Sequence, residues 1–226
     1  MNKEYLSILT EVKLFNGIDT SALGAMLACL GTNFKTFDKG EYIFTVGSKV
    51  ENIGIVIDGN IKITKEDVFG RQTIIESLGK THLFGEVLAC AGGEKSPVSV
   101  VGASKTVVCF IDFSRVATSC KNSCAFHAQL IRNMLGLLAQ KNITLNKKLD
   151  YLTLKGMREK LSKYLLDLYE SHKSANFTIP FNREELADYL SVDRSAMSRE
   201  LCRMRDEGII NFEKNRFEIT NIQGLM

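Results

Sequence analysis

Polar side chains recur on one side of a predicted helix that begins at Arg194. Within residues 194–205, Ala196, Met197 and Leu201 are spaced to face inward on a helix. The side chains left to face solvent are those of Arg194, Ser195, Ser198, Arg199 and Arg203. An arginine guanidinium donates two parallel hydrogen bonds to the two major-groove acceptors of guanine, and a serine hydroxyl can bond several base edges. The pattern therefore predicts a surface that reads DNA.

A second short helix is predicted just before this surface. Asn182 and Glu185 have the spacing of a capping box, and an apolar face follows at Leu186, Ala187 and Leu190. Residues 191–193 break the pattern, and Asp193 can cap the helix that follows. Two such helices make a helix-turn-helix, whose second helix enters the major groove. We also expect Arg183 to contact DNA; the alternative is an ordinary amphipathic helix pair with solvated arginines.

Two short β-type runs, IINFEK and RFEIT, follow Gly208 and meet at Lys214-Asn215. This pattern is typical of a hairpin, and a hairpin after a recognition helix makes a winged helix-turn-helix. We expect Lys214 and Arg216 to contact DNA phosphates. The alternative is that both are solvated turn charges.

Charge and composition limit the classes of function. The net charge is +3, and by our count residues 150–226 hold 12 Lys/Arg and 13 Asp/Glu. This balance argues against a non-specific nucleic-acid binder, which depends on bulk positive charge, but not against local arginines that read sequence. The three histidines stand in three different predicted elements, and no nucleophile elbow or nucleotide-binding fingerprint is present. We therefore expect no enzyme.

The chain has no signal-peptide core and no apolar stretch of membrane-spanning length, so we expect a cytoplasmic protein without membrane contact. Its six cysteines are scattered, and reduced thiols are the default in that compartment. Cys120 and Cys124 are four residues apart and would share one helical face. They are either a redox pair, half of a metal site, or two small residues near a helix start. No further ligand is placed by the sequence, so we predict no metal site.

The N-terminal half changes period near residue 34. Residues 3–30 are predicted to be helical, and residues 34–112 consist of short β-type runs separated by glycines or charged turns. In IVIDGNIKI, the pair Asp58-Gly59 predicts a β-hairpin, because this dipeptide suits the turn that matches strand twist. Many short strands at such spacing favour a rolled β-sandwich resembling a jelly roll.

A long helix is predicted after Asp112. Two interleaved series of residues recur seven positions apart. The first is Ile131, Leu138, Leu145 and Leu152, and the second is Leu135, Asn142 and Leu149, so that one Asn stands among apolar residues. This is a coiled-coil heptad pattern, and one buried Asn on such a seam fixes the register of two strands. We predict a parallel homodimer contact. The alternative is a helix packed on its own subunit, with Asn142 hydrogen-bonded locally.

The expected fold class is α+β, in three parts. Residues 1–112 form a β-roll with N-terminal helices that senses an effector, residues 113–152 form the dimerisation helix, and residues 153–226 form the winged helix-turn-helix. This order resembles the Crp/Fnr family of bacterial transcription regulators. The resemblance spans essentially the whole chain and is carried by FDKGEYIFTVG, IVIDGNIKI, LFGE and VDRSAMSREL.

The resemblance implies an effector-controlled homodimer that binds palindromic double-stranded DNA, with RNA polymerase as a partner if it activates. The two recognition helices would be spaced about 34 Å apart, as adjacent major grooves require. Arg194 and the pair Ser198-Arg199 match the family's recognition helix. Ser195 replaces a base-contacting glutamate, which leaves the half-site sequence open. A ligand-binding module that acts through a protein partner instead of DNA is the alternative function.

The effector site implied by the resemblance comprises Gly85, Glu86, Ser96, Pro97, Val98 and Thr144. In members that bind cyclic nucleotides, an Arg-Ser pair holds the phosphate, and Ser96-Pro97 occupies its place here. Without the arginine, the phosphate loses a bidentate, charge-assisted contact, which argues against cyclic AMP. The alternative is that Lys95, next to this position, supplies the charge, although it lacks the planar fork.

Other cofactors of the family find little support. Iron–sulfur members carry a cluster of N-terminal cysteines, whereas Cys29 is the only cysteine before Cys90. Haem-binding members use a β-roll histidine, for which His82 is a distant counterpart. The sequence leaves the effector unidentified.

Overall fold

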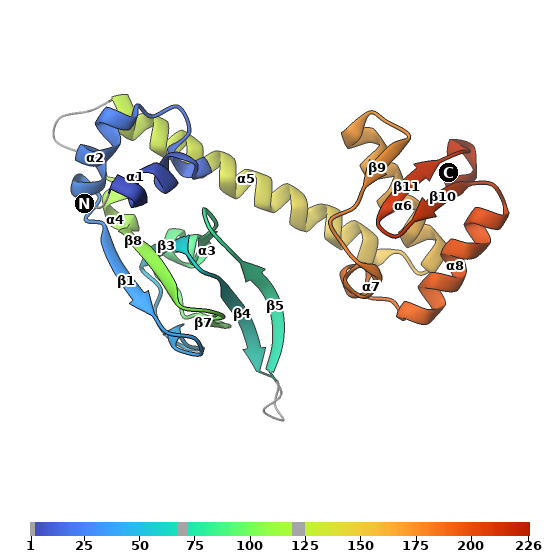
Figure 1. Ribbon diagram of the computed structural model, residues 1–226, viewed down its shortest axis with the longest axis horizontal. Coiled ribbons are helices and arrows are strands. Elements are labelled where there is room, and N and C mark those ends of the chain that lie inside the picture. The colour runs from blue at the N-terminus through green and yellow to red at the C-terminus, as the bar shows by residue number, and fades with distance from the viewer. Residues whose placement is uncertain (1–2, 67–71, 119–124) are drawn as a thin grey trace. The chain divides into compact units, whose positions relative to one another are not determined.

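The structure is a computed structural model that describes residues 3–66, 72–118 and 125–226. The chain divides into two compact units, residues 1–139 and 140–226. Two antiparallel sheets and their helices make the first unit, and helices with a small sheet make the second (Figure 1). The predicted α+β class, with a β-rich N-terminal domain, a long helix and a C-terminal winged helix-turn-helix, is confirmed.

The first unit begins with helices and continues with eight short strands within the described residues. The helices are α1 (Lys3–Thr10), η1 (Lys13–Phe15) and α2 (Thr20–Cys29). The strands, interrupted by the short helix α3 (Glu86–Cys90), are β1 (Asn33–Phe37), β2 (Tyr42–Phe44), β3 (Asn52–Asp58), β4 (Ile61–Glu66), β5 (Gln72–Leu78), β6 (Leu83–Phe84), β7 (Ser99–Gly102) and β8 (Thr106–Asp112).

These strands form two four-stranded antiparallel sheets, ordered β1-β8-β3-β6 and β2-β7-β4-β5. An apolar cluster fills the space between them. It takes Val56 and Val108 from the first sheet, and Ile61 and Val100 from the second. The sheets therefore face each other, as the predicted β-roll requires.

Strand β3 is buried on both faces, which explains its unbroken apolar run. Val56 points into the cluster between the sheets, whereas Ile53, Ile55 and Ile57 point to the other side. There they meet a second apolar cluster built with residues of α1, α2 and the long helix. Alternation is absent from the sequence of this strand because neither face meets water.

The predicted hairpin at Asp58-Gly59 is wrong. Strands β3 and β4 lie in different sheets and do not pair with each other. The turn is held by the β7–β8 connection: the hydroxyl of Thr106 donates to the Asn60 carbonyl at 2.8 Å. Gly59 has φ +79°, so the Asp-Gly dipeptide supplies the turn as expected, but the chain crosses between sheets there.

The predicted helical segment 113–152 contains two helices, α4 (Phe113–Ala117) and α5 (Ala125–Thr153). Cys120 and Cys124 lie outside the described residues. The two compact units divide within α5, between residues 139 and 140. The reason is that Tyr151, in the last turns of α5, is buried in the core of the second unit.

Helix α5 uses one face within its own chain and leaves another exposed. Leu130 and Met134 are buried in the helix-covered cluster of the first unit. Of the predicted dimer seam, Ile131 and Leu138 are partly buried, and Leu138 packs against that same cluster. The rest of the seam is exposed, at 61% for Leu135, 61% for Leu145 and 56% for Leu149.

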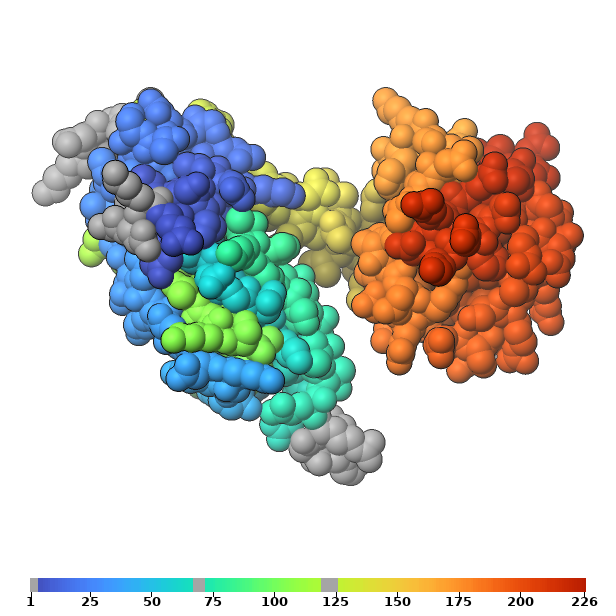
Figure 2. All heavy atoms as spheres, viewed as in Figure 1, coloured from blue at the N-terminus to red at the C-terminus, as the bar shows by residue number. Residues whose placement is uncertain are grey.

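The second unit continues with α6 (Met157–His172), β9 (Asn176–Thr178), α7 (Arg183–Leu190), α8 (Arg194–Asp206), β10 (Ile210–Glu213), β11 (Arg216–Ile219) and η2 (Ile222–Leu225). Strands β10 and β11 form the predicted hairpin, and β9 extends the sheet in the order β10-β11-β9. One apolar core joins α6, α7, α8 and this sheet, so that the unit is closely packed (Figure 2).

Replacing Gly59 tests the crossover between the sheets. A Cβ at this residue would collide with the Lys105 carbonyl oxygen, and the positive φ disfavours any other residue. Gly40 has a similar φ of +85°, and a Cβ there would meet no atom within 4 Å. We expect Gly59→Ala to lower the free energy of unfolding by at least about 1 kcal/mol more than Gly40→Ala, measured by calorimetry. Equal losses would contradict the crossover.

Candidate nucleic-acid interface and effector site

The two helices of the helix-turn-helix are capped as the sequence predicted. Asn182 Oδ1 accepts hydrogen bonds from the backbone N–H groups of Glu184 and Glu185, at 2.9 and 3.0 Å. The Glu185 carboxylate accepts in return from the Asn182 N–H at 2.8 Å. Asp193 accepts from the Ala196 N–H at 2.8 Å and so starts α8. These caps fix where each helix begins, and thus which residues face solvent.

Helix α8 keeps its apolar side in the core and its arginines in solvent. Met197, Leu201 and Met204 are fully buried. Arg194 and Arg199 are exposed, and the guanidinium of neither makes a hydrogen bond or ion pair with any residue that the structure describes. Their donors are therefore available to an external acceptor. A guanidinium with all its donors in water suits bidentate recognition of a base or phosphate.

The two serines of α8 have their hydroxyl protons engaged within the helix. Ser195 Oγ donates to Asp193 at 2.6 Å, and Ser198 Oγ donates to the Arg194 carbonyl at 2.9 Å. The hydrogen bond from Ser195 holds the pKa of Asp193 below its usual range. As placed, each serine offers its oxygen lone pairs to a partner, which suits an amino group on a base edge.

An ion-pair network joins α8 to α6. The Arg158 guanidinium donates to Glu200 and to Glu207, each at 2.7 Å. Glu200 also accepts from Arg203 at 3.4 Å, so Arg203 is exposed but partly committed to its own helix. Nearby, the ammonium of Lys160 donates to the Leu190 carbonyl at the end of α7, at 3.1 Å. These contacts hold both helices of the motif against α6.

Arg183 does not share the exposed position of the other cations predicted to contact DNA. It is half-buried, and its guanidinium lies 4.7 Å from the ring centroid of Phe212 and 4.9 Å from that of Phe217. Burial lowers the pKa of this group. The sequence pattern missed these partners, although the two-residue turn at 214–215 pairs Phe212 with Phe217 across the hairpin.

At the tip of the wing, Lys214 and Arg216 are exposed as expected. Lys214 has φ +52°, the left-handed conformation that the tight turn requires. Both cations lie on the same hairpin and point no donor at a carboxylate that the structure describes. Their contact with phosphate stays a prediction.

Of the predicted effector residues, Gly85 and Glu86 lie at the start of α3. Gly85 has φ +74°, and a Cβ there would approach Val50 and the Asn52 carbonyl at 3.1 and 3.3 Å. Glu86 is the first residue of α3 and is 2% exposed. The glycine is therefore required by the tight turn, and the buried carboxylate is positioned by the helix it begins.

Ser96 and Pro97 belong to a loop that satisfies its own polar groups. The hydroxyl of Ser96, which is 2% exposed, donates to the Val98 carbonyl at 2.7 Å and accepts from the Val98 N–H at 3.2 Å. The backbone of Ser96 bonds with that of Gly47 and Ser48. Neither residue offers a cation, and the only side-chain donor of the pair is already used.

Two further residues were considered as contacts for an effector or a haem, Thr144 and His82. Thr144 lies on the part of α5 that belongs to the second unit, and its hydroxyl donates to the Gln140 carbonyl at 3.0 Å. Its role toward an effector stays a prediction. His82 is exposed, and its Nδ1 lies 3.0 Å from the Lys80 carbonyl. Across residues 3–66, 72–118 and 125–226, no three His, Cys, Asp or Glu side chains are grouped to hold a metal ion.

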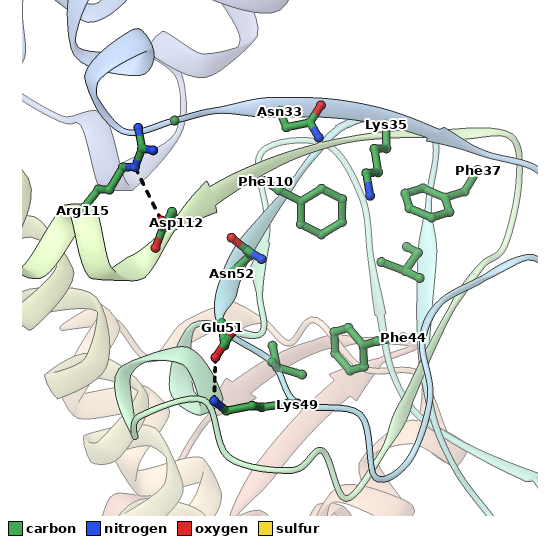
Figure 3. A pocket seen from close by; sticks show the side chains of 13 residues that line it. Asn33, Lys35, Phe37, Phe44, Lys49, Glu51, Asn52, Phe110, Asp112 and Arg115 are labelled. Atoms are coloured by element: carbon green, nitrogen blue, oxygen red, sulfur yellow. Dashed lines mark ion pairs between the residues drawn. The ribbon is translucent and has the colours of Figure 1, made fainter.

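A groove of about 440 Å³ in the first unit was not anticipated (Figure 3). Phe37, Phe44 and Phe110 contribute aromatic lining. Its polar lining residues are Asn33, Lys35, Lys49, Glu51, Asn52, Asp112 and Arg115. Two of the three cations pair with carboxylates, Lys49 with Glu51 at 2.6 Å and Arg115 with Asp112 at 3.5 Å. The sequence could not indicate this groove, because its residues come from segments far apart in the chain.

Two family models match most of the chain between them. The Crp-like helix-turn-helix domain matches residues 159–226, and the cyclic nucleotide-binding domain matches residues 34–123. Within the described residues, no helix is both long and apolar enough to cross a membrane.

Similar proteins include regulators that the chain covers almost entirely. It is 23% identical to the CRP-like cAMP-activated global transcriptional regulator of Mycobacterium tuberculosis, over 96% of each chain. It is also 23% identical to the probable transcriptional regulator flp of Lacticaseibacillus casei, over 97% of this chain and 96% of that one.

Solved structures share the fold. The catabolite activator protein of Thermus thermophilus superposes with a TM-score of 0.55 and 21% identity, covering 94% of this chain and 96% of that chain. A CooA mutant from Carboxydothermus hydrogenoformans gives a TM-score of 0.59 at 15% identity, covering 88% of each chain.

The cap at Asn182 can be tested by substitution. Asn182→Ala leaves two backbone N–H groups of α7 without their acceptor, and we expect the second unit to lose about 1 kcal/mol of unfolding free energy. Asn182→Asp keeps the acceptor and is the matched control. Calorimetry of the full chain measures both. A loss as large in the aspartate variant would show that the side-chain cap is not what stabilises this helix.

Proposed function

The chain belongs to the Crp/Fnr family of transcription regulators, and on that premise we propose that it is a homodimer that reads a palindromic DNA site under the control of a signal sensed in its β-roll. The observation that carries the proposal is the outer face of α8. There, Arg194 and Arg199 stand exposed with free donors on a helix whose start is fixed by Asp193.

Base reading is assigned to the first turns of α8. Arg199 is proposed to bond guanine, with Arg194, Ser195 and Ser198 positioned beside it and Arg203 one turn further along. Lys214 and Arg216 of the wing are proposed to bind phosphate. Helix residues near the N-terminus of a recognition helix reach base edges, while peripheral cations fix the register on the duplex.

The proposed dimer forms along the exposed side of α5. Leu135, Leu145 and Leu149 are each more than half exposed on one seam, which is a large apolar area for water to cover. Asn142 lies on the same seam, where its Oδ1 accepts from Asn146 at 2.8 Å. In a parallel pair, facing asparagines can bond each other and so select the two-stranded register. Two-fold symmetry of the dimer is what requires a palindromic site.

The proposed signal differs from a cyclic nucleotide. A cyclic phosphate carries a negative charge that a guanidinium fork binds in a bidentate way, and Ser96 and Pro97 offer a satisfied hydroxyl and a tertiary amide instead. The neighbouring Lys95 supplies a positive charge but no planar fork. Another small molecule, or a redox change, remains the proposed input. If the protein activates transcription, RNA polymerase is its proposed partner.

Arg199→Ala tests base reading. We expect it to weaken binding to the specific site by about 1–3 kcal/mol and to relax preference at one base pair. Lys214→Ala is the comparison: it should weaken all sequences alike and reduce the slope of log affinity against log salt by about 1. Both are measured by titrating duplexes of varied sequence and salt. Equal loss on every sequence for Arg199→Ala would identify it as a phosphate contact.

The dimer seam is tested by a charge placed on it. Leu145→Glu should convert the dimer to a monomer, because two carboxylates would be buried face to face in the coiled coil. Ile143, which is 49% exposed, lies on the same helix outside the seam. Ile143→Glu is therefore the control and should leave the dimer intact. Sedimentation equilibrium decides. A dimer that survives Leu145→Glu contradicts the seam.

The effector assignment is tested by thermal shift. A ligand at 100 times its Kd stabilises the folded state by about 2.7 kcal/mol. We expect no shift with cyclic AMP or cyclic GMP, because the phosphate finds no arginine. The same measurement with oxidant, reductant and small metabolites searches for the signal. Stabilisation by cyclic AMP at micromolar concentration would overturn this part of the proposal.

A further inference from the structure

Arg183 occupies a position that local electrostatics disfavour. It is the first residue of α7, immediately after the cap Asn182. The N-terminus of a helix carries partial positive charge, so that acidic residues are favoured there and cations are not. The next two residues, Glu184 and Glu185, follow this rule. A cation at residue 183 therefore needs a partner elsewhere in the fold.

The partner is the aromatic side of the wing. The guanidinium carbon of Arg183 lies 4.7 Å from the ring centroid of Phe212 and 4.9 Å from that of Phe217. The two rings are themselves 5.7 Å apart on opposite strands of the hairpin. Both distances are within the range in which a ring face attracts a cation, and partial burial strengthens that attraction.

The wing strand that carries Phe212 is anchored in the core at its start, where Ile210 is 1% exposed, and is unpaired along one edge among the described strands. Strand β10 is an edge strand, and among the described strands it pairs only with β11. Phe212 is half-buried, whereas Phe217 is 2% exposed and stacks on Phe177 of β9 at 6.4 Å. A second guanidinium, that of Arg205 near the end of α8, lies 5.5 Å from the Phe212 ring. Both helices of the motif thus place an arginine on this one ring.

We propose that Arg183 is a positioning residue, whose guanidinium holds the wing hairpin against the helix-turn-helix through Phe212 and Phe217, and that it is not a phosphate contact. The inference rests on the proposed function, since a correctly placed wing matters for binding DNA. Its chemistry depends on shape as well as charge. A guanidinium is planar and lies flat on a ring, whereas the ammonium of lysine is a strongly hydrated point charge.

The first test uses the protein alone, without DNA. Amide hydrogen exchange of β10 and β11 is measured in Arg183→Gln, Arg183→Lys and Phe212→Leu. We expect the β10 amides to exchange about three- to tenfold faster in all three variants, because opening of the edge strand loses the stacked contact. Phe212→Tyr keeps the ring and should restore protection. Arg216→Gln removes a cation from the same hairpin, away from the rings, and should leave exchange unchanged.

The second test measures DNA binding as a function of salt. We expect Arg183→Lys to weaken DNA binding about as much as Arg183→Gln, about three- to tenfold, although lysine keeps the charge that a phosphate contact would need. Arg216→Gln should instead reduce the slope by about 0.9, as the loss of one phosphate contact does.

The outcomes separate this inference from the proposed function. Unchanged exchange in Arg183→Gln overturns the inference, as does an Arg183→Lys variant that binds like wild type while Arg183→Gln lowers the salt slope. Failure of the unmodified protein to bind any duplex overturns the proposed function, and the exchange measurement still decides the role of Arg183. If Phe212→Leu does not fold, the two Arg183 variants carry the test.

Discussion

Burial of both faces of the β1-β8-β3-β6 sheet is the constraint on which the first unit depends. Its inner face is closed by the opposite sheet, so its outer face, with Ile53, Ile55 and Ile57, needs a separate cover. The N-terminal helices and the first turns of α5 supply it, through residues such as Leu130 and Met134. One side of α5 is thereby committed to its own chain. The leucines on another side are exposed, which supports the proposal of a dimer built along the same helix.

In the second unit, packing of the apolar core decides where the charged side chains lie. The apolar side of each helix is buried in the core, and the remaining side chains face solvent or a neighbouring element. Arg199 and Arg183 are both arginines of the helix-turn-helix. The side chain of Arg199 is exposed to solvent, whereas the guanidinium of Arg183 lies over the rings of Phe212 and Phe217. Arg158, which bridges Glu200 and Glu207, has a third role. The function of an arginine here is set by its surroundings.

The effector region combines the expected turn geometry with altered chemistry. Gly85 adopts a left-handed turn, and Glu86 begins α3 and is buried. Ser96 uses its hydroxyl within its own loop. The groove beside Phe110 is lined by different residues altogether, with two of its three cations already paired.

The sequence by itself determined the features that local chemistry specifies. These include the caps at Asn182 and Asp193, the strand-rich region, the long helix and the wing hairpin, because each depends on residues a few positions apart. Tertiary structure decided what local signals cannot carry. The dipeptide Asp58-Gly59 predicts a hairpin between β3 and β4. In the folded chain β3 pairs with β8 and β4 pairs with β7, so that the two strands lie in different sheets. Likewise, the sequence pattern predicts that Arg183 is a surface cation. In the structure its guanidinium lies over the ring of Phe212, which is 29 positions further along the chain. Pairings between distant segments are settled by the packing of the whole core, which no short window of sequence contains.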